Sequence, residues 1–368
     1  MAHFEFDNLG KTVPVRENHA LPIDSLQRHL VKELPEFVSP IKKLLQFKGG
    51  QSNPTYFIED TASNRYVLRK KPHGKILKSA HAVDREFKVM KALSTTAVPV
   101  PNARFLCEDP TVIGTTFYIM DYVEGRVFTD IQLSGLPPRD KREIFLASAA
   151  ALASIHDVDL KAVGLQTFGR PENYYKRQLA RWSSQYQQSC AAGAPAIAAM
   201  ERLIAYLRHN LPDDNACCLV HGDFRIDNLI FHPSKNEVVA VLDWELSTLG
   251  HPLADLSYNC LMFHLPSGLP HLSGLSGVDL DSLGIPNEEE YVRHYCGIRG
   301  ISCIRNWSFY LAFSLFRSAA ILQGVYARAL QGNASDARAL TVGGMAQMMV
   351  EGALELTEST NTDIQARL

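Results

Sequence analysis

The spacing of hydrophobic positions divides the chain into a strand-rich part followed by a helix-rich part. Between residues 41 and 120, short apolar runs predict strands over 44–47, 55–58, 66–69, 105–107 and 117–120. Apolar positions at helical spacing predict helices over 25–34, with Asp24 placed to cap it, and over 79–93. One helix on an antiparallel sheet indicates a small lobe of α+β type.

Beyond residue 126 the pattern is mainly helical. A helix is predicted over 139–156, and His156 at its end is expected to cap or pack rather than to catalyse. The most apolar stretch, 307–322, contains Arg317 and is shorter than a membrane span requires, so it indicates a core helix. Three brief apolar runs, 217–220, 229–231 and 238–242, predict short strands.

The strongest chemical signal lies among these three short strands. His221-Gly-Asp223 is followed by Asn228 after five positions and by Asp243 after fifteen more. Kinase-type phosphoryl transfer uses three such groups in this order. The first is a carboxylate that orients a hydroxyl, and the other two are an amide and a carboxylate that hold Mg²⁺. Taken alone, the first triplet could be a turn and Asp243 a helix cap, but three such residues between apolar strands favour a site.

A glycine turn between the first two predicted strands is a candidate phosphate site. Gly49 and Gly50 permit a sharp turn close to an anion, and Ser52 and Asn53 offer N–H groups and side-chain donors. An ordinary hairpin would also use two glycines here. The metal-type loop downstream favours the phosphate role.

These motifs resemble a known family. The segment His221-Gly-Asp-Phe-Arg-Ile-Asp-Asn228 with Val241-Leu-Asp243-Trp-Glu245 resembles the aminoglycoside phosphotransferase and choline kinase superfamily. The segments 49–56 and 67–72 are similar to one branch, the kinase-like domain fused to acyl-CoA dehydrogenases in some animals and free-standing in bacteria. The resemblance covers about Gln46 to Arg328. It implies a bilobal protein-kinase-like fold, a small antiparallel-sheet lobe before a large and mostly helical lobe, with ATP, Mg²⁺ and a small-molecule acceptor.

The resemblance also suggests roles for the strand after the glycine turn. Arg69 matches the position that meets the phosphates, and Val67 matches the one that packs on adenine. Strand alternation puts Lys70 on the opposite face, where it remains the alternative cation. Glu86, on the following helix, is expected to pair with Arg69; the other interpretation is a solvated surface charge.

The same resemblance suggests the domain boundaries. Residues 1–120 would hold an N-terminal helix and the nucleotide-binding lobe, 121–125 the hinge, and 126–368 the catalytic and acceptor-binding lobe. Backbone groups near Asp121 and Val123 are expected to bind the adenine edge. Asp255 is expected to brace the catalytic loop through its backbone, which makes it structural rather than a ligand.

Composition bears on the partners and the cellular location of the protein. A formal net charge of −2 gives no reason to expect nucleic acid or an anionic membrane as partner. Seven cysteines without a C-x-x-C pair do not indicate a disulfide or zinc framework. The first residues are polar and acidic where a signal peptide needs an apolar run. We expect a cytoplasmic protein; the sequence does not indicate its oligomeric state.

The charge of the helical part bears on the acceptor. Residues 171–210 and 291–330 together contain ten lysines and arginines against two glutamates. If these helices wall the acceptor site, an anionic acceptor is favoured and polycationic aminoglycosides are disfavoured; the alternative is that the basic side chains point to solvent. Arg317, inside an apolar helix, needs an anionic partner, either the substrate or a structural aspartate. Tyr174, Gln178 and Trp182 share a helix face and form either an acceptor wall or, as is commoner, a packing stripe.

Together these features predict an ATP- and Mg²⁺-dependent kinase that phosphorylates a hydroxyl of a small, anionic molecule. The fusion in relatives suggests a hydroxyacyl thioester or a hydroxy acid. A choline-, sugar- or aminoglycoside-type kinase is the alternative within this class. A nucleotide-binding scaffold without catalysis is the alternative outside it, although such a scaffold would be free to lose Asp223, Asn228 and Asp243.

Overall fold

The computed structural model describes residues 11–48, 53–72, 82–213, 216–269, 273–331, 344–358 and 363–365. The chain forms two compact units that interleave along the sequence. The first comprises residues 1–129, 159–165 and 225–247, and the second comprises 130–158, 166–224 and 248–368. The segment that carries Asp243 therefore belongs to the N-terminal sheet unit, although it lies late in the sequence.

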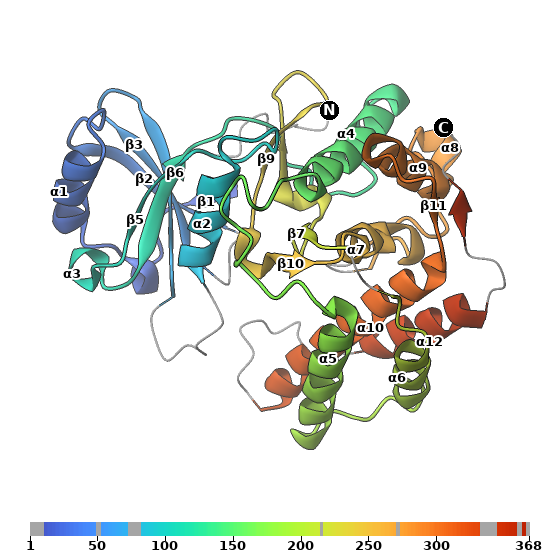
Figure 1. Cartoon of the computed structure of the whole chain (residues 1–368). Helices are drawn as coiled ribbons and strands as arrows, with labels where there is room; N and C mark the ends of the chain where they lie inside the picture. Colours follow the sequence, from blue (N-terminus) through green and yellow to red (C-terminus); the bar gives the residue numbers. More distant parts are fainter. Residues whose placement is uncertain are drawn as a thin grey trace. The chain divides into compact units, whose positions relative to one another are not determined.

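A six-stranded antiparallel sheet forms the centre of the first unit (Figure 1). Its strand order is β1-β2-β3-β4-β6-β5. The strands are β1 (Thr12–Val13), β2 (Ile41–Phe47), β3 (Thr55–Asp60), β4 (Arg65–Lys70), β5 (Ala103–Cys107) and β6 (Phe117–Asp121). All five strands predicted between residues 41 and 120 are present, each extended by one to three residues at one or both ends.

Helices cover both faces of this sheet. On one face, α1 (Ile23–Glu33) and α3 (Pro110–Ile113) enclose a core that includes Leu26, Leu30, Ile58 and Phe117. On the other face lies α2 (Val83–Leu93), which contacts β5 and β6. Helix α1 begins two residues earlier than predicted, so Asp24 lies within its first turn and makes no side-chain cap. The prediction that Asp24 caps the helix was therefore wrong, because Ile23 already adopts helical backbone.

Two short segments complete the first unit. The hairpin of β8 (Leu229–Phe231) and β9 (Val238–Val241) is flanked by two 3₁₀ turns, η3 (Ile226–Asn228) and η4 (Trp244–Leu246). A further turn, η2 (Glu17–His19), precedes α1. Gly125 packs so closely on Phe231 that a Cβ there would lie 2.3 Å from the Phe231 carbonyl oxygen, and this explains the need for glycine.

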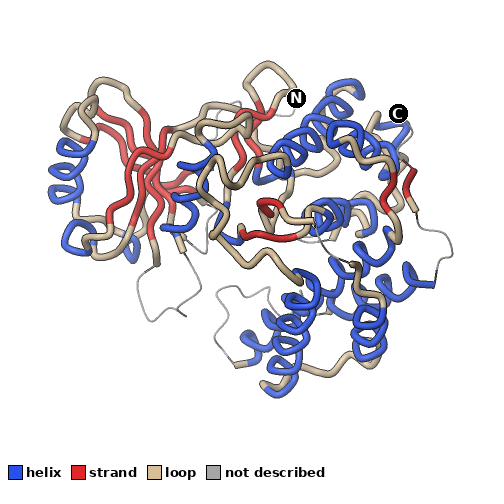
Figure 2. Tube along the Cα trace, viewed as in Figure 1, coloured by secondary structure: helices blue, strands red, loops and turns tan. Residues whose placement is uncertain are grey.

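The second unit is mostly helical (Figure 2). Its longer helices are α4 (Pro138–His156), α5 (Tyr174–Ala191), α6 (Met200–His209), α7 (Leu253–His264), α9 (Glu288–Arg299), α10 (Trp307–Leu330) and α12 (Met345–Glu358). The shorter elements are α8 (Leu280–Leu283) and the strands β7 (Cys218–Val220), β10 (Thr248–Gly250), β11 (Cys303–Ile304) and β12 (Ile364–Gln365). The α+β prediction is confirmed.

Helix α10 is the core of this unit and contacts α5, α6, α7 and α12. By length and composition it is apolar enough to cross a membrane, but 78% of its most apolar window is buried by the protein itself. The prediction of a core helix in this region is therefore confirmed.

Candidate active site

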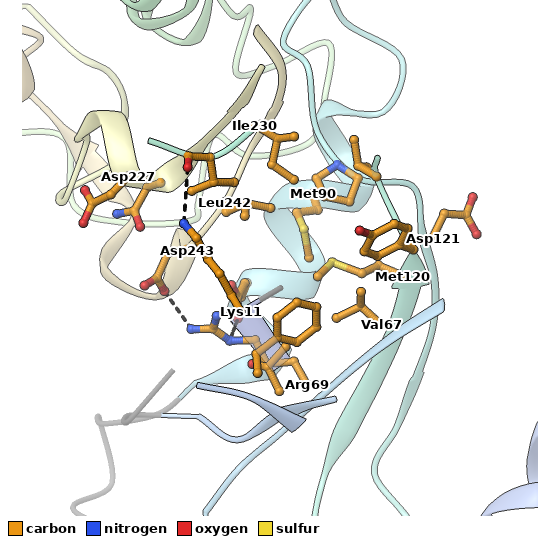
Figure 3. A pocket seen from close by; sticks show the side chains of 18 of the residues that line it. Lys11, Val67, Arg69, Met90, Met120, Asp121, Asp227, Ile230, Leu242 and Asp243 are labelled. Carbon is orange, nitrogen blue, oxygen red and sulfur yellow. Dashed lines mark hydrogen bonds and ion pairs between the residues drawn. The ribbon is translucent and has the colours of Figure 1, made fainter. Parts of the chain in front are cut away.

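A cavity of about 370 Å³ in the first unit is lined by residues of β4, α2, β6, β8 and the turns around β9 (Figure 3). Its apolar lining includes Val67, Met90, Met120, Ile230 and Leu242. Its polar lining includes Arg69, Glu86, Asp227, Asn228 and Asp243. Flat apolar walls beside a few convergent charged groups are typical of a nucleotide or cofactor site.

Arg69 is the centre of the charged part of the cavity. Its Nε lies 3.0 Å from Oε2 of Glu86, and its Nη2 lies 2.7 Å from Oδ1 of Asp243. The same Nη2 lies 3.7 Å from Oε2 of Glu245, which accepts a hydrogen bond from Nδ2 of Asn53 at 3.0 Å. One guanidinium is thus shared among three carboxylates.

Burial and the contacts of Arg69 with three carboxylates shift the pKa values of both Arg69 and Glu86. Burial lowers the pKa of Arg69, but Glu86, Asp243 and Glu245 outweigh it and hold the pKa above its ordinary value. Burial raises the pKa of Glu86 to about 7, and Asp243 and Glu245 add to the rise against the opposing effect of Arg69. Glu86 is 1% exposed, so the alternative of a solvated surface charge is excluded.

Strand alternation separates the two candidate cations as predicted from the pattern. Arg69 lines the cavity, whereas Lys70 is fully buried in the sheet core with Nζ 6.0 Å from the ring centre of Tyr56. Burial lowers the pKa of Lys70. Of the two, only Arg69 faces the space that a nucleotide would occupy.

The hairpin of β8 and β9 brings Asn228 and Asp243 to the same cavity. Leu229 pairs with Val241, and the Leu242 N–H donates to the Asn228 carbonyl at 2.8 Å, so the residues flanking the hairpin lie side by side. Asp243 adopts a left-handed backbone with φ of 66°, after which η4 begins. The buried indole of Trp244 donates to the Val241 carbonyl at 3.0 Å and holds this turn.

The chemistry of these two side chains fits Mg²⁺. A carboxylate and an amide offer the hard oxygen ligands that Mg²⁺ prefers, and the ion commonly completes its shell with water and substrate phosphates. Among the described residues, no group of three His, Cys, Asp or Glu side chains forms a metal site by itself.

The residues of the predicted hinge also line this cavity. Asp121 ends β6, Tyr122 and Val123 follow it directly, and all three are part of the lining. The N–H of Tyr122 donates to the Arg65 carbonyl at 3.2 Å, which fixes the strand end. Gly49, Gly50 and Ser52 lie outside the described residues, and of the predicted turn the structure describes only Asn53, which is fully buried.

The loop that carries Asp223 belongs to the second unit. Gly222 has a φ of 86° and connects β7 to Asp223. Asp255, near the start of α7, accepts hydrogen bonds from the N–H of His221 at 2.6 Å and of Gly222 at 2.8 Å. The predicted role of Asp255 as a brace for the loop is therefore confirmed.

Buried groups behind the loop hold Asp255 in turn. His156 Nε2 lies 3.3 Å from Oδ2 of Asp255, and His156 Nδ1 lies 2.6 Å from the hydroxyl of Tyr295. Burial raises the pKa of Asp255, but the hydrogen bond with His156 and the loop N–H groups outweigh it, so the net shift is downward. His156 is a packing residue, as expected from its position at the end of a core helix.

Asp223 itself is oriented by α7. The hydroxyl of Tyr258 donates to Oδ1 of Asp223 at 2.7 Å, and Nδ2 of Asn259 donates to the Phe224 carbonyl at 3.2 Å. Asp223 lies in one compact unit and Asn228 and Asp243 in the other. Their convergence around one ion therefore stays a prediction.

Arg317 lies beside the same loop, within the second unit. Its Nη2 donates to the Gly222 carbonyl at 2.6 Å, and its guanidinium lies 5.0 Å from the ring centre of Tyr258 and 5.7 Å from that of Trp182. No structural aspartate pairs with it among the described residues. The predicted need of this arginine for a partner is met in part by a loop carbonyl and two aromatic rings.

Most of the basic surplus points to solvent. Of the ten basic residues counted in the two helical stretches, seven are exposed: Lys176, Arg181, Arg202, Arg208, Arg293, Arg305 and Arg328. On the predicted helix face, Tyr174 and Trp182 are buried and Gln178 is half-buried. This burial agrees with a packing stripe for the two aromatic residues, so Arg317 becomes the main structural support for an anionic acceptor.

Comparison with known proteins shows the family. The sequence model of the phosphotransferase enzyme family, also abbreviated APH, matches residues 43–272. The chain belongs to the phosphotransferase enzyme family. This family match confirms the resemblance seen in the motifs.

Individual relatives agree with the family match. Acyl-CoA dehydrogenase family member 10 of Mus musculus is 51% identical over 340 residues, which cover 92% of this chain and 31% of that protein. The chain thus spans about a third of the length of this curated relative. A crystal structure of a proposed aminoglycoside phosphotransferase from Ralstonia eutropha is 41% identical, has a TM-score of 0.83, and covers 92% of this chain and 99% of that one.

More distant structures share the fold alone. An aminoglycoside phosphotransferase solved with AMP-PNP and hygromycin B has a TM-score of 0.60 at 16% identity, covering 91% of this chain and 99% of that one. Choline kinase from Cryptosporidium parvum has a TM-score of 0.64 at 12% identity, covering 91% and 95%. These likenesses confirm the bilobal kinase-like fold of this phosphotransferase family member.

Three residues near the candidate sites escaped the sequence reasoning. Lys11 and Asp227 line the cavity, and Tyr258 contacts Asp223. Asp227 accepts hydrogen bonds from Nε of Arg225 at 3.1 Å and from its Nη2, and in the sequence it stands within the family motif. Lys11 precedes every predicted element, and Tyr258 stands three positions after Asp255 on one helix, a spacing that could have signalled a shared face.

Proposed function

We propose that the chain is an ATP- and Mg²⁺-dependent phosphotransferase that acts on a hydroxyl of a small, anionic molecule. The observation that carries the proposal is the cavity in which Arg69, Asn228 and Asp243 meet beside apolar walls. A cation, an amide and a carboxylate at one end of an apolar slot match the needs of a nucleoside triphosphate with its metal.

In this proposal each group of residues has one task. Val67 and Met120 would pack on the adenine, and the backbone of Asp121 to Val123 would meet its edge. Arg69 would bind phosphate oxygens, while Asn53 and the glycine turn with Gly49, Gly50 and Ser52 would cover them. Glu86 would orient Arg69, with which it already pairs at 3.0 Å.

Asn228 and Asp243 would hold Mg²⁺, which neutralises developing charge on the phosphates when bound. Asp223 would accept the proton of the acceptor hydroxyl or orient that hydroxyl for attack. Its Oδ1 accepts from Tyr258, which orients the carboxylate for this task. The loop has the support this task requires, since Asp255 fixes the two N–H groups that precede Asp223.

The finer proposal concerns the acceptor. A hydroxyacyl thioester or a hydroxy acid would present a carboxylate or phosphate, and Arg317 is the residue we assign to it, with Tyr174 and Gln178 as lower-ranked wall residues. One guanidinium nitrogen is engaged with Gly222, and no other described residue accepts a hydrogen bond from Arg317, which leaves donors for a ligand. A choline-, sugar- or aminoglycoside-type acceptor is the alternative, and a non-catalytic scaffold is the alternative from another class.

The seven cysteines are all free thiols, which supports the proposed location in a reducing cytoplasm. We propose no nucleic-acid or membrane partner, in keeping with the balanced charge.

The test is phosphate incorporation from radiolabelled ATP into four acceptor classes: hydroxyacyl thioesters, hydroxy acids, amino alcohols and aminoglycosides. We expect Mg²⁺-dependent labelling of the first or second class, abolished in Asp223→Asn. Labelling of an amino alcohol or an aminoglycoside would retain the kinase and reject the anionic acceptor. Nucleotide binding without labelling of any class would favour the scaffold.

A further inference from the structure

The segment Lys11 to Val13 lies before the region matched by the family model, yet it joins the cavity wall. Its last two residues form β1 and add an edge strand to the sheet, with Thr12 opposite Phe47 and Val13 opposite Gln46. The Lys48 N–H donates to the Lys11 carbonyl at 2.8 Å and extends the pairing by one residue. The backbone of Lys11 is therefore fixed next to Phe47, which lines the cavity too.

The side chain of Lys11 enters the cavity. Lys11 is part of the lining, and its Nζ donates to the Val127 carbonyl at 3.3 Å (Figure 3). Val127 follows the hinge by a few residues and also lines the cavity. The ammonium group thus lies at the wall of the space that we assign to the nucleotide, where it donates to the Val127 carbonyl.

Lys11 is one of the few positive charges in a cavity lining whose charged residues are mostly acidic. The lining contains two basic residues, Lys11 and Arg69, against four carboxylates, Glu86, Asp121, Asp227 and Asp243. Arg69 is engaged with Glu86, Asp243 and Glu245, so its charge is already balanced by protein groups. A polyanionic triphosphate needs more positive charge than Arg69 and one bound divalent ion leave available.

We propose that Lys11 is a nucleotide-binding residue that contacts the phosphates, supplied by a segment outside the family match. The inference rests on the proposed function, since it assumes that the cavity takes a nucleotide. When the nucleotide enters, Nζ exchanges the Val127 carbonyl for a phosphate oxygen, and a neutral acceptor is replaced by a charged one. The ammonium donor already forms a charge-assisted hydrogen bond to the carbonyl, and a phosphate oxygen adds the attraction of an opposite charge, so the exchange favours binding.

The experiment is calorimetric binding of ATP, ADP and adenosine to the full chain in three variants. Lys11→Met removes the charge while keeping the length of the side chain, and Lys11→Arg keeps a charge. Lys43→Met is the matched control, because Lys43 is exposed on β2, the strand that pairs with β1, and is not part of the lining. Thermal unfolding of each variant checks that β1 still pairs with β2.

We expect Lys11→Met to weaken ATP and ADP binding by about tenfold and to leave adenosine binding unchanged, as loss of one charge-assisted contact predicts. Lys11→Arg should recover most of the affinity, and Lys43→Met should bind like the wild type. Equal weakening of adenosine and ATP would overturn the proposal, since it would make Lys11 a part of the cavity wall only. Unchanged ATP binding by Lys11→Met would overturn it as well.

The two proposals fail in different ways. Wild-type protein that binds none of the three compounds would reject the nucleotide site itself. Wild-type protein that binds ATP, together with a normal Lys11→Met variant, rejects only the role of Lys11.

Discussion

The hydroxyl of Tyr258 donates a hydrogen bond to Oδ1 of Asp223 across 2.7 Å. Tyr258 is anchored on α7, the helix whose Asp255 also braces the loop before Asp223. The carboxylate is therefore restricted at one oxygen, and a reaction that depends on positioning gains from such a restriction.

Tyr258→Phe should lower kcat by about tenfold and leave the KM for ATP unchanged, because the substitution removes an orienting hydrogen bond and keeps the ring. Steady-state kinetics over a range of pH measures both kcat and the KM for ATP. A purely structural role of Tyr258 would lower the thermal midpoint instead and leave the pH profile of the folded enzyme as it was.

Asp223→Asn should lower turnover by roughly 10²-fold to 10⁴-fold, since an amide cannot take up the proton of the acceptor. Mg-ATP binding should stay nearly intact, because Asn228 and Asp243 carry the metal in our proposal. Parallel kinetics and calorimetry give both quantities. Turnover close to that of the wild type would remove Asp223 from the mechanism.

Arg69→Met should lower the free energy of unfolding by about 3 kcal/mol, because Glu86 is 1% exposed and would lose its partner. The double variant with Glu86→Gln should be more stable than Arg69→Met alone, since no unpaired carboxylate is then buried at position 86. Urea unfolding of the two single variants and the double variant forms the cycle. If the losses of unfolding free energy in the two single variants simply added up in the double variant, Arg69 and Glu86 would not be coupled.

Arg317→Met should raise the KM for a carboxylate- or phosphate-bearing acceptor by about tenfold to a hundredfold and spare the KM for ATP. The matched control is Arg181→Met. Arg181 is exposed and lies 4.9 Å from the ring centre of the same Trp182. A similar rise in KM for both variants would indicate bulk surface charge rather than a specific contact.

The stability of the second unit should fall on acidification. Burial, and secondarily His156, lower the pKa of His251 to about 4 from an ordinary value of 6.5. The unfolded chain takes up the proton first, so the contribution of neutral His251 is complete above pH 6.5 and is lost as the pH falls toward 4. The loss amounts to about 3 kcal/mol.

His251→Gln should show a shallower decline of the unfolding free energy between pH 6.5 and 4 than the wild type. Glutamine keeps an acceptor for the Leu253 N–H, which donates to His251 Nδ1 at 3.2 Å. Denaturant titrations at several pH values measure the slopes. Parallel curves for the two proteins would contradict the assignment.

The sequence predicted the elements well because their patterns are local. The strands around Val67 and the core helix around Arg317 follow from alternation and from helical spacing. The start of α1 was misplaced, since Asp24 is as acceptable in a first turn as at a cap. The separation of Arg69 from Lys70 was predictable for the same local reason.

Several contacts between distant segments were not predicted from the sequence. The pairing of Arg69 with Glu86 was expected and is confirmed, but the sharing of Arg69 with Asp243 and Glu245 depends on how the β8–β9 hairpin packs with α2, which no spacing encodes. Lys11 reaches the cavity only because β1 pairs with the edge of β2. The excess of basic residues in the two helical stretches was a poor guide to the acceptor site, because composition does not tell which side chains are exposed to solvent.

The left-handed backbone at Asp243 determines which substitutions there can be interpreted. Alanine would remove the carboxylate and also place an unsuitable residue at φ of 66°, a distortion of about 1 kcal/mol that has nothing to do with magnesium. Asparagine tolerates this conformation and keeps the shape of the side chain, so it separates the loss of charge from the loss of local geometry. Mutational scans that rely on alanine would thus overstate how much of the defect at this position is chemical.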